Sequence, residues 1–136
     1  MAKAKFTISV TCEWTQDKLV EILSGATYGS DWLEITVTDD ARKSITKAES
    51  DCREDIWAKV LLAGEKIITL DHEDIDDDNK PAAKFLSLKD FDKALKVMGK
   101  EAPKALMRIV EGEGEADYYD YNNLLQCAMF KEIVYG

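Results

Sequence analysis

Two spacings of apolar residues alternate along this chain of 136 residues, and this alternation constrains the fold more than any other feature. Residues 5–12 and 32–38 place an apolar side chain at every second position, the period of a strand with one buried face. The run 66–70 is typical of a third strand and 132–136 of a terminal one. The longer segments between them repeat apolar residues with the period of a helix. The sequence therefore predicts an α+β fold, with a small, mainly antiparallel sheet of three or four strands and four or five packed helices.

The predicted helices carry recognisable start and stop signals. Thr15 is suited to cap a helix that ends near Gly25, and Gly29 marks the turn that follows. Ser87 and Asp90 have the spacing of a capping box, with Asp where Glu is usual, ahead of a second amphipathic helix. These signals fix the beginnings of two helices from sequence alone.

Three further segments have helical periodicity. Residues 39–63 carry one apolar stripe that stops at Gly64, although their charged middle is also compatible with two helices broken near residues 50–51. Residues 103–109, which begin with a proline, are compatible with a short helix or an extended piece. A last helix is predicted to begin near Asp117. No linker or internal repeat interrupts the pattern, so residues 1–136 are expected to form a single domain.

The charge balance excludes several classes of partner. The chain has 27 acidic against 18 basic residues and a net charge of −9. A general nucleic-acid or anionic-membrane binder would carry the opposite sign, so we expect no direct binding to either. No signal peptide and no apolar run of ~20 residues is found. Cys12, Cys52 and Cys127 are widely spaced within apolar patterns, which favours buried, reduced thiols and a cytoplasmic location.

The C-terminal segment Leu124-Leu125-Gln126-Cys127-Ala128-Met129-Phe130-Lys131-Glu132-Ile133-Val134-Tyr135-Gly136 is distinctive. It resembles the tail of a family of small acidic proteins of unassigned function encoded by bacteriophages and mobile elements of bacteria. The aromatic-glycine segment 28–32 and the entry to a helix at 85–88 match the same family loosely. The tail departs at Lys131, where glycine is commoner, and the chain departs in the charged segment 42–63. The resemblance implies a phage accessory gene expressed in a bacterial cytoplasm, and it carries no catalytic residue.

Acidic residues are concentrated in two stretches. The first, at 71–78, is predicted to be a loop, and the second, at 111–120, precedes and begins the last helix. Their acidic members are Asp71, Glu73, Asp74, Asp76, Asp77, Asp78, Glu111, Glu113, Glu115, Asp117 and Asp120. Three interpretations stay open for the first stretch: a solvated loop, a calcium site, or a surface that recognises a basic partner. The calcium site is disfavoured because the EF-hand spacing lacks both its glycine and its closing glutamate.

Tyr118 and Tyr119 lie among the acids of the second stretch, a combination that suits a protein interface, although ordinary packing is the simpler interpretation. We therefore take both stretches, with these two tyrosines, as the candidate partner-contact surface. No histidine-rich, serine-histidine-aspartate or zinc-protease pattern is present, so no catalytic, metal or cofactor residue is predicted.

These observations predict a non-enzymatic phage or mobile-element protein. It would bind and inhibit a host nucleic-acid-handling defence protein, as anti-CRISPR proteins do, by presenting carboxylates to a basic surface that normally receives DNA or RNA. Two alternatives to this prediction stay open. The first is a structural or regulatory phage protein, which acts through a homodimer or through another phage protein. The second is an enzyme of unrecognised type.

Overall fold

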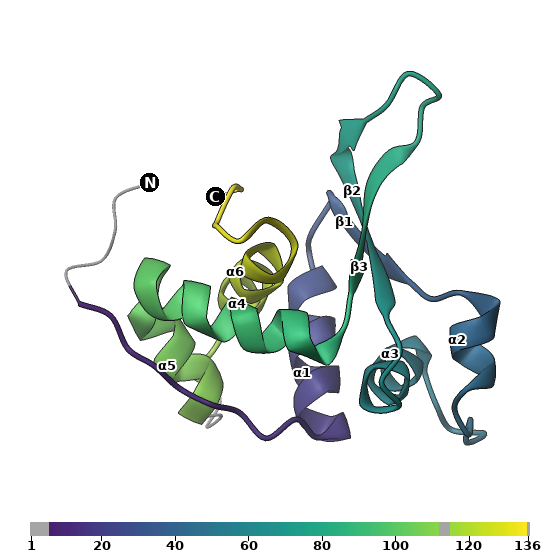
Figure 1. Cartoon of the computed structure of the whole chain (residues 1–136), viewed down its shortest axis with the longest axis horizontal. Helices are drawn as coiled ribbons and strands as arrows, with labels where there is room; N and C mark the ends of the chain where they lie inside the picture. The colour runs from purple at the N-terminus through teal and green to yellow at the C-terminus, as the bar shows by residue number, and fades with distance from the viewer. Residues whose placement is uncertain (1–5, 112–114, 136) are drawn as a thin grey trace.

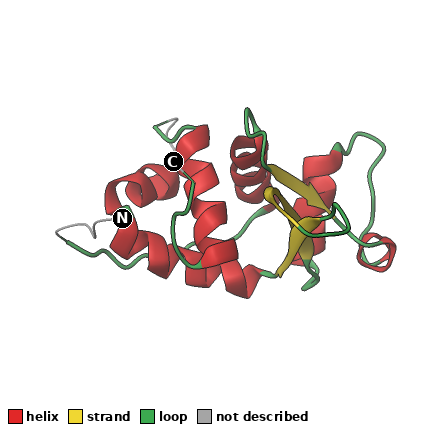
Figure 2. Ribbon diagram, turned by 90° about the horizontal axis from the view of Figure 1, so that it is seen from above, coloured by secondary structure: helices red, strands yellow, loops and turns green. Residues whose placement is uncertain are grey.

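The computed structural model describes residues 6–111 and 115–135. Over these residues the chain forms six helices and one antiparallel sheet of three strands, which confirms the predicted α+β class. Figure 1 shows α5, α6 and most of α4 on one side of α1, the start of α4 in front of α1, and the sheet with α2 and α3 on the other side. Figure 2, seen from above, shows the strands with helices on either side of them. The element order is α1 (Gln16–Thr27), β1 (Leu33–Thr36), α2 (Asp39–Lys43), α3 (Arg53–Leu62), β2 (Ile67–Ile75), β3 (Pro81–Leu86), α4 (Leu88–Glu101), α5 (Pro103–Glu111) and α6 (Tyr118–Phe130).

The sheet has the order β1-β2-β3, with β2 in the centre. Leu33 of β1 lies opposite Asp71 of β2, and Ile67 at the start of β2 lies opposite Leu86 of β3. One face carries Leu33, Ile67 and Leu86 into the core. Strand β2 thus continues beyond the predicted strand 66–70, and strand β3 was not predicted. Backbone pairing explains both differences, because it does not require apolar side chains.

The helices pack around one core to which α1, α4 and α6 contribute most of the large side chains. Thr15 caps α1 by accepting a hydrogen bond from the Lys18 backbone N–H, at 3.2 Å. Ser87 and Asp90 form the predicted capping box of α4. The fully buried members of these three helices include Leu19, Ile22, Leu23, Phe91, Met98, Leu124 and Leu125. Burial of each such side chain contributes about 1.5–3 kcal/mol.

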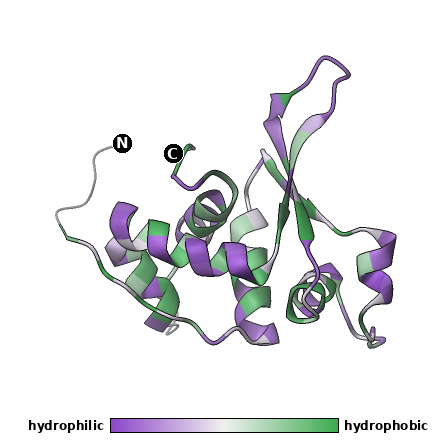
Figure 3. Ribbon diagram, in the orientation of Figure 1, coloured by the Kyte–Doolittle hydropathy of each residue, from purple (hydrophilic) through white to green (hydrophobic). Residues whose placement is uncertain are grey.

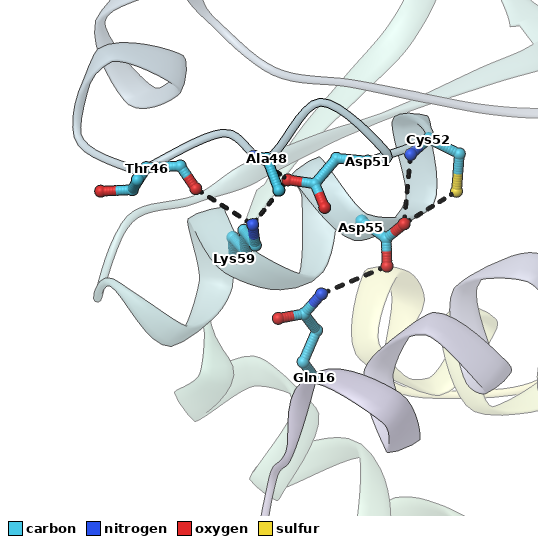
Figure 4. A network of polar contacts seen from close by, with 7 residues as sticks. All are labelled: Gln16, Thr46, Ala48, Asp51, Cys52, Asp55 and Lys59. Atoms are coloured by element: carbon cyan, nitrogen blue, oxygen red, sulfur yellow. Dashed lines mark hydrogen bonds and ion pairs between the residues drawn. The ribbon is translucent and has the colours of Figure 1, made fainter.

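The segment 39–63 forms two helices, and the chain between them is held by polar contacts (Figure 4). Lys59 of α3 donates to an Asp51 carboxylate oxygen at 2.5 Å and to the Thr46 carbonyl at 3.0 Å. The break therefore covers residues 44–52, in agreement with the two-helix alternative. Cys52 begins α3 and is exposed, contrary to the expectation that all three thiols are buried; only Cys127 is.

Over the residues that the structure describes, neither predicted terminal strand forms. Within the described part of 5–12, the chain runs extended along α4, and the Ile8 N–H donates to the Gly99 carbonyl at 3.0 Å. A Cβ on Gly99 would lie 2.1 Å from the Ile8 carbonyl oxygen, so only glycine permits this approach. Ile8, Val10 and Cys12 of this segment are partly buried against the core, and the segment adds no strand to the described sheet.

The C-terminal segment is held by one side chain of α6. Lys131, with φ of 60°, ends the helix and turns the chain back. The Gln126 side-chain oxygen then accepts the backbone N–H groups of Val134 and Tyr135, both at 2.7 Å. These N–H groups are therefore engaged by a side chain and do not enter a sheet. Gln126, which is 1% exposed, thus holds the C-terminal segment against α6.

Candidate binding surface

The distal half of the β2–β3 hairpin extends beyond the rest of the sheet (Figure 1). Strand β1 pairs with β2 only as far as Asp71. Residues 72–81 then continue as a two-stranded ribbon with an irregular register between Asp71 and Ile75. The first acidic stretch, predicted to be a loop, is therefore half strand and half turn. Beyond Asp71, every residue of this stretch is exposed.

The tip of this hairpin is an ordered turn built around Asp76. One Asp76 carboxylate oxygen accepts the backbone N–H groups of Asp78 and Lys80, both at 2.9 Å. Asn79 adopts φ of 63°, a left-handed conformation that asparagine tolerates well. The Asp76 side chain is thus occupied with the backbone, and it sets the direction in which its neighbours point.

Four other acids of the stretch are available to a partner. Glu73, Asp74, Asp77 and Asp78 are exposed. Among the described residues, none of their carboxylates takes part in a hydrogen bond or ion pair. Figure 3 shows that the hairpin tip is mostly hydrophilic, whereas hydrophilic and hydrophobic residues alternate along the helices. Lys80 is the one basic residue within the turn, so the tip keeps a strong negative charge.

Asp71, the first residue of the stretch, belongs to the interior. It is 3% exposed and accepts hydrogen bonds from the Tyr135 hydroxyl at 2.8 Å and the Glu73 backbone N–H at 2.9 Å. Its register on β2 places it on the core side of the sheet, opposite Leu33. The expectation that Asp71 contacts a partner is corrected accordingly, because a partner cannot reach its carboxylate.

The contact between Tyr135 and Asp71 predicts a loss of stability in alkali. The hydrogen bond to Asp71 raises the pKa of Tyr135 to about 12. Below pH ~10 the phenol is protonated in the folded and unfolded chains, and the contact contributes fully. Between pH ~10 and about 12 the unfolded chain loses this proton first, so stability falls.

We expect Tyr135→Phe to lower the free energy of unfolding at pH 7 by about 1–3 kcal/mol, because the buried Asp71 carboxylate loses a donor. The variant should also lose less further stability between pH 9 and 12 than the original chain. Urea unfolding at several pH values measures both effects. Equal alkaline slopes for the two proteins would contradict the assigned contact.

The second stretch is divided between surface and interior. Glu111 at the end of α5, Glu115, and Asp117 at the cap of α6 are exposed, while Glu113 lies outside the described residues. Asp120 is 4% exposed, so the prediction that it contacts a partner is also corrected. Arg108 of α5 donates to both Asp120 carboxylate oxygens, each bond measuring 2.8 Å. This pair fixes the start of α6 to α5.

The two tyrosines of this stretch are exposed, Tyr119 by 57% and Tyr118 by 38%. They lie with Tyr28 and Trp32 around a cleft of about 280 Å³ that Glu73 of the hairpin also lines. The structure therefore brings part of the second stretch to the base of the first. The sequence singles out residues 28–32 for a turn at Gly29, the start of a strand at residue 32 and a loose resemblance to phage proteins, not for a shared site. Their place beside α6 and β2 arises from tertiary contacts.

The described residues show no assembled centre for metal chemistry. No three histidine, cysteine or acidic side chains among them are grouped as metal ligands. His72 lies 2.7 Å from a Glu34 carboxylate oxygen on the exposed side of the sheet. Burial raises the pKa of the Cys127 thiol to about 12, which disfavours the thiolate needed of a nucleophile. None of the helices in the described ranges has the length and apolar character that crossing a bilayer requires.

Comparison with protein-family models, with curated proteins and with solved structures finds no match to this chain. The resemblance of its tail to phage proteins therefore stays a prediction. The exposed residues that a partner can contact form an ordered acidic hairpin with an aromatic cleft at its base.

Proposed function

We propose that this chain is a non-enzymatic accessory protein of a phage or mobile element. It binds a host nucleic-acid-handling defence protein through its acidic hairpin and inhibits that protein. The phage origin is supported by the resemblance of the tail. The mode of binding is supported by the structure of the hairpin. The host cytoplasm is the compartment in which such a partner is met.

The projection of the hairpin is the observation that carries this proposal. A loop that only keeps carboxylates in water needs neither a projecting two-stranded ribbon nor a turn in which two backbone N–H groups bond to Asp76. Such a ribbon can enter a basic channel that a flat acidic surface cannot reach. With the turn already formed, little conformational entropy is lost on binding.

Charge complementarity gives the choice of partner. Nucleic-acid-binding channels present lysine and arginine to a dense row of phosphates. Asp74, Asp77 and Asp78 supply negative charges close together, and neither hydrogen bonds nor ion pairs within the described chain occupy them. Opposite potentials also accelerate encounter at low salt.

The test is a variant in which Asp74, Asp77 and Asp78 are changed to asparagine, sparing the structural Asp76. We expect it to bind the partner at least about tenfold more weakly and with a flatter salt dependence, because its charges steer and hold the complex. The original and variant proteins are used to capture proteins from bacterial lysate at low and high salt. Affinity and inhibition are then measured with the purified partner.

A matched control removes three exposed carboxylates elsewhere, through Asp40→Asn, Glu65→Gln and Glu132→Gln. It has the same net charge as the hairpin variant and should keep most of the affinity. If the control weakens binding as much as the hairpin variant does, the net charge of the protein determines the affinity and the hairpin has no special role. A captured protein whose nucleic-acid activity is unchanged would contradict inhibition.

A second candidate function, self-association as a structural or regulatory phage protein, is favoured by the outer face of the sheet. Phe85 is 57% exposed there and lies opposite the half-buried Ile68. Two such faces could bury apolar area against one another. A mass that doubles with concentration and is insensitive to salt would favour this function over the first.

A further inference from the structure

An aromatic and acidic cleft lies where the hairpin meets the helical layer. Three separate segments line it: the turn after α1, the beginning of α6, and β2. Gly29, with φ of 65°, directs the chain from α1 into β1. The backbone N–H of His72 donates to the Trp32 carbonyl at 2.8 Å, and this bond holds the turn beside β2. The cleft is thus fixed by backbone contacts and does not depend on mobile side chains alone.

Four aromatic side chains surround the cleft. The rings of Tyr118 and Tyr119 lie 4.3 Å apart between centroids, and Tyr28 meets Tyr118 at 5.6 Å with an angle of 67°. Trp32 is backed by Tyr135, with centroids 4.6 Å apart. Tyr28 is 71% exposed, an unusual position for a large ring that packs on others. These rings offer π faces and edges to a ligand within a small volume.

Two carboxylates share the cleft with these rings. Asp31 and Glu73 are both exposed and line it from opposite segments. Neither side chain has a hydrogen-bonding or ionic partner within the described ranges. The lining also includes Ser30 and Asn122, and the Asn122 amide donates to the Ala26 carbonyl at 2.8 Å and to the Ser30 hydroxyl at 3.4 Å. The free chemistry of the cleft is therefore aromatic and anionic.

We propose that this cleft binds the side chain of an arginine on the protein partner. The guanidinium stacks on the tyrosines and donates hydrogen bonds to Asp31 and Glu73. This inference rests on the proposed function, for which it names the anchoring contact. A cation is selected because aromatic faces and carboxylates both attract positive charge. Phosphate-bearing ligands are repelled by the same two carboxylates.

Arginine fits better than the other biological cations. Its planar guanidinium stacks on a ring and still directs several N–H donors sideways to carboxylates. A quaternary ammonium group has no donor for Asp31 and Glu73. The ammonium of lysine is more strongly hydrated and stacks less well. The volume of about 280 Å³ is at the small end of ligand sites, as a single side chain requires.

The first test uses small probes, so it does not depend on any host protein. N-acetyl-arginine amide is titrated into the protein and followed through the backbone amide signals of Gly29, Tyr119 and Asn122. N-acetyl-citrulline amide has nearly the same shape without the charge. We expect arginine to bind at least about tenfold more tightly than citrulline. Equal affinities, or shifts spread over the whole surface, would overturn the proposal.

Variants locate the bound probe. Tyr119→Leu and Glu73→Gln change exposed side chains, so both should fold normally, and each should weaken arginine binding by about threefold to tenfold. Glu65→Gln removes the same charge as Glu73→Gln from an exposed residue that lies outside both the cleft lining and the hairpin. It should leave probe binding unchanged. If Glu65→Gln weakens arginine binding as much as Glu73→Gln does, the overall negative field attracts the probe and the cleft does not.

The same variants separate this inference from the proposed function. Probe binding at the cleft without capture of a defence protein would leave the arginine site standing and remove the proposed function. Capture of a defence protein with unchanged affinity for Tyr119→Leu and Glu73→Gln would retain the function and overturn the arginine anchor.

Discussion

Replacing Gln126 with methionine is expected to lower the free energy of unfolding by about 2–4 kcal/mol. Methionine keeps the length and most of the volume, so the packing loss is small. What is lost are four hydrogen bonds of one buried side chain. Its oxygen accepts from Val134 and Tyr135, and its amide donates to the Asn122 side chain at 2.8 Å and the Tyr135 carbonyl at 3.1 Å.

The effect should extend beyond stability, because release of the tail separates Tyr135 from Trp32 and from Asp71. We expect faster hydrogen exchange at Val134 and Tyr135 and an altered tryptophan emission in the folded variant. Urea unfolding measures the stability change. Gln16→Met is the matched control, since the Gln16 amide donates only one bond, to Asp55 at 3.2 Å (Figure 4). A loss no larger than the control's would show that Gln126 does not hold the tail.

Replacing Arg108 with methionine should cost about 2–4 kcal/mol. The variant leaves the carboxylate of Asp120, 6% exposed as a side chain, without the two bonds that the guanidinium gives it. An unpaired buried charge is costly, and loss of one partner from a fully buried pair usually costs more than this. The effect is smaller here because 43% of the Arg108 side chain is in contact with water.

A second substitution distinguishes the unpaired charge from simple loss of packing. Asp120→Asn, added to Arg108→Met, removes the charge while an oxygen stays available to accept the backbone N–H of Asp117, the residue whose side chain caps α6. The double variant should therefore be more stable than Arg108→Met alone, as thermal unfolding will measure. Arg53→Met is the control, because Arg53 is 71% exposed and its pair with Glu54 should contribute less than about 1 kcal/mol. A double variant that is less stable than Arg108→Met alone would contradict this account.

The parts of the fold that were predicted correctly rest on local signals. Thr15 begins α1 because its side chain accepts the backbone N–H of Lys18. Ser87 begins α4 because the Asp90 carboxylate, three residues away, accepts the Ser87 backbone N–H. Strand β3 was missed because its residues 81–86 have no alternating pattern, and they are held as a strand by backbone bonds to β2. Gly25 is a predicted helix end, yet it lies inside α1. The glycine there makes room for Tyr121, which occupies the space where a Cβ would lie.

The candidate surface divides in the same way. Charge density is a property of the sequence, and it correctly placed Asp74, Asp77 and Asp78 on the surface. Asp71 and Asp120 belong to the same runs of acids, yet they are buried because Tyr135 and Arg108 supply donors from distant positions in the chain. No local pattern distinguishes these two acids from their neighbours.

The sequence by itself determined the α+β class, the capped helices and the concentration of acids, because each depends on residues close together in the chain. The tertiary structure alone decided which acids face a partner, how the tail closes on Gln126, and that Tyr28, Trp32 and Tyr119 share a cleft with Glu73. The contact between Asp71 and Tyr135, for example, joins residues 64 positions apart. Such contacts form only when packing of the core has fixed the register of β2 and the position of α6.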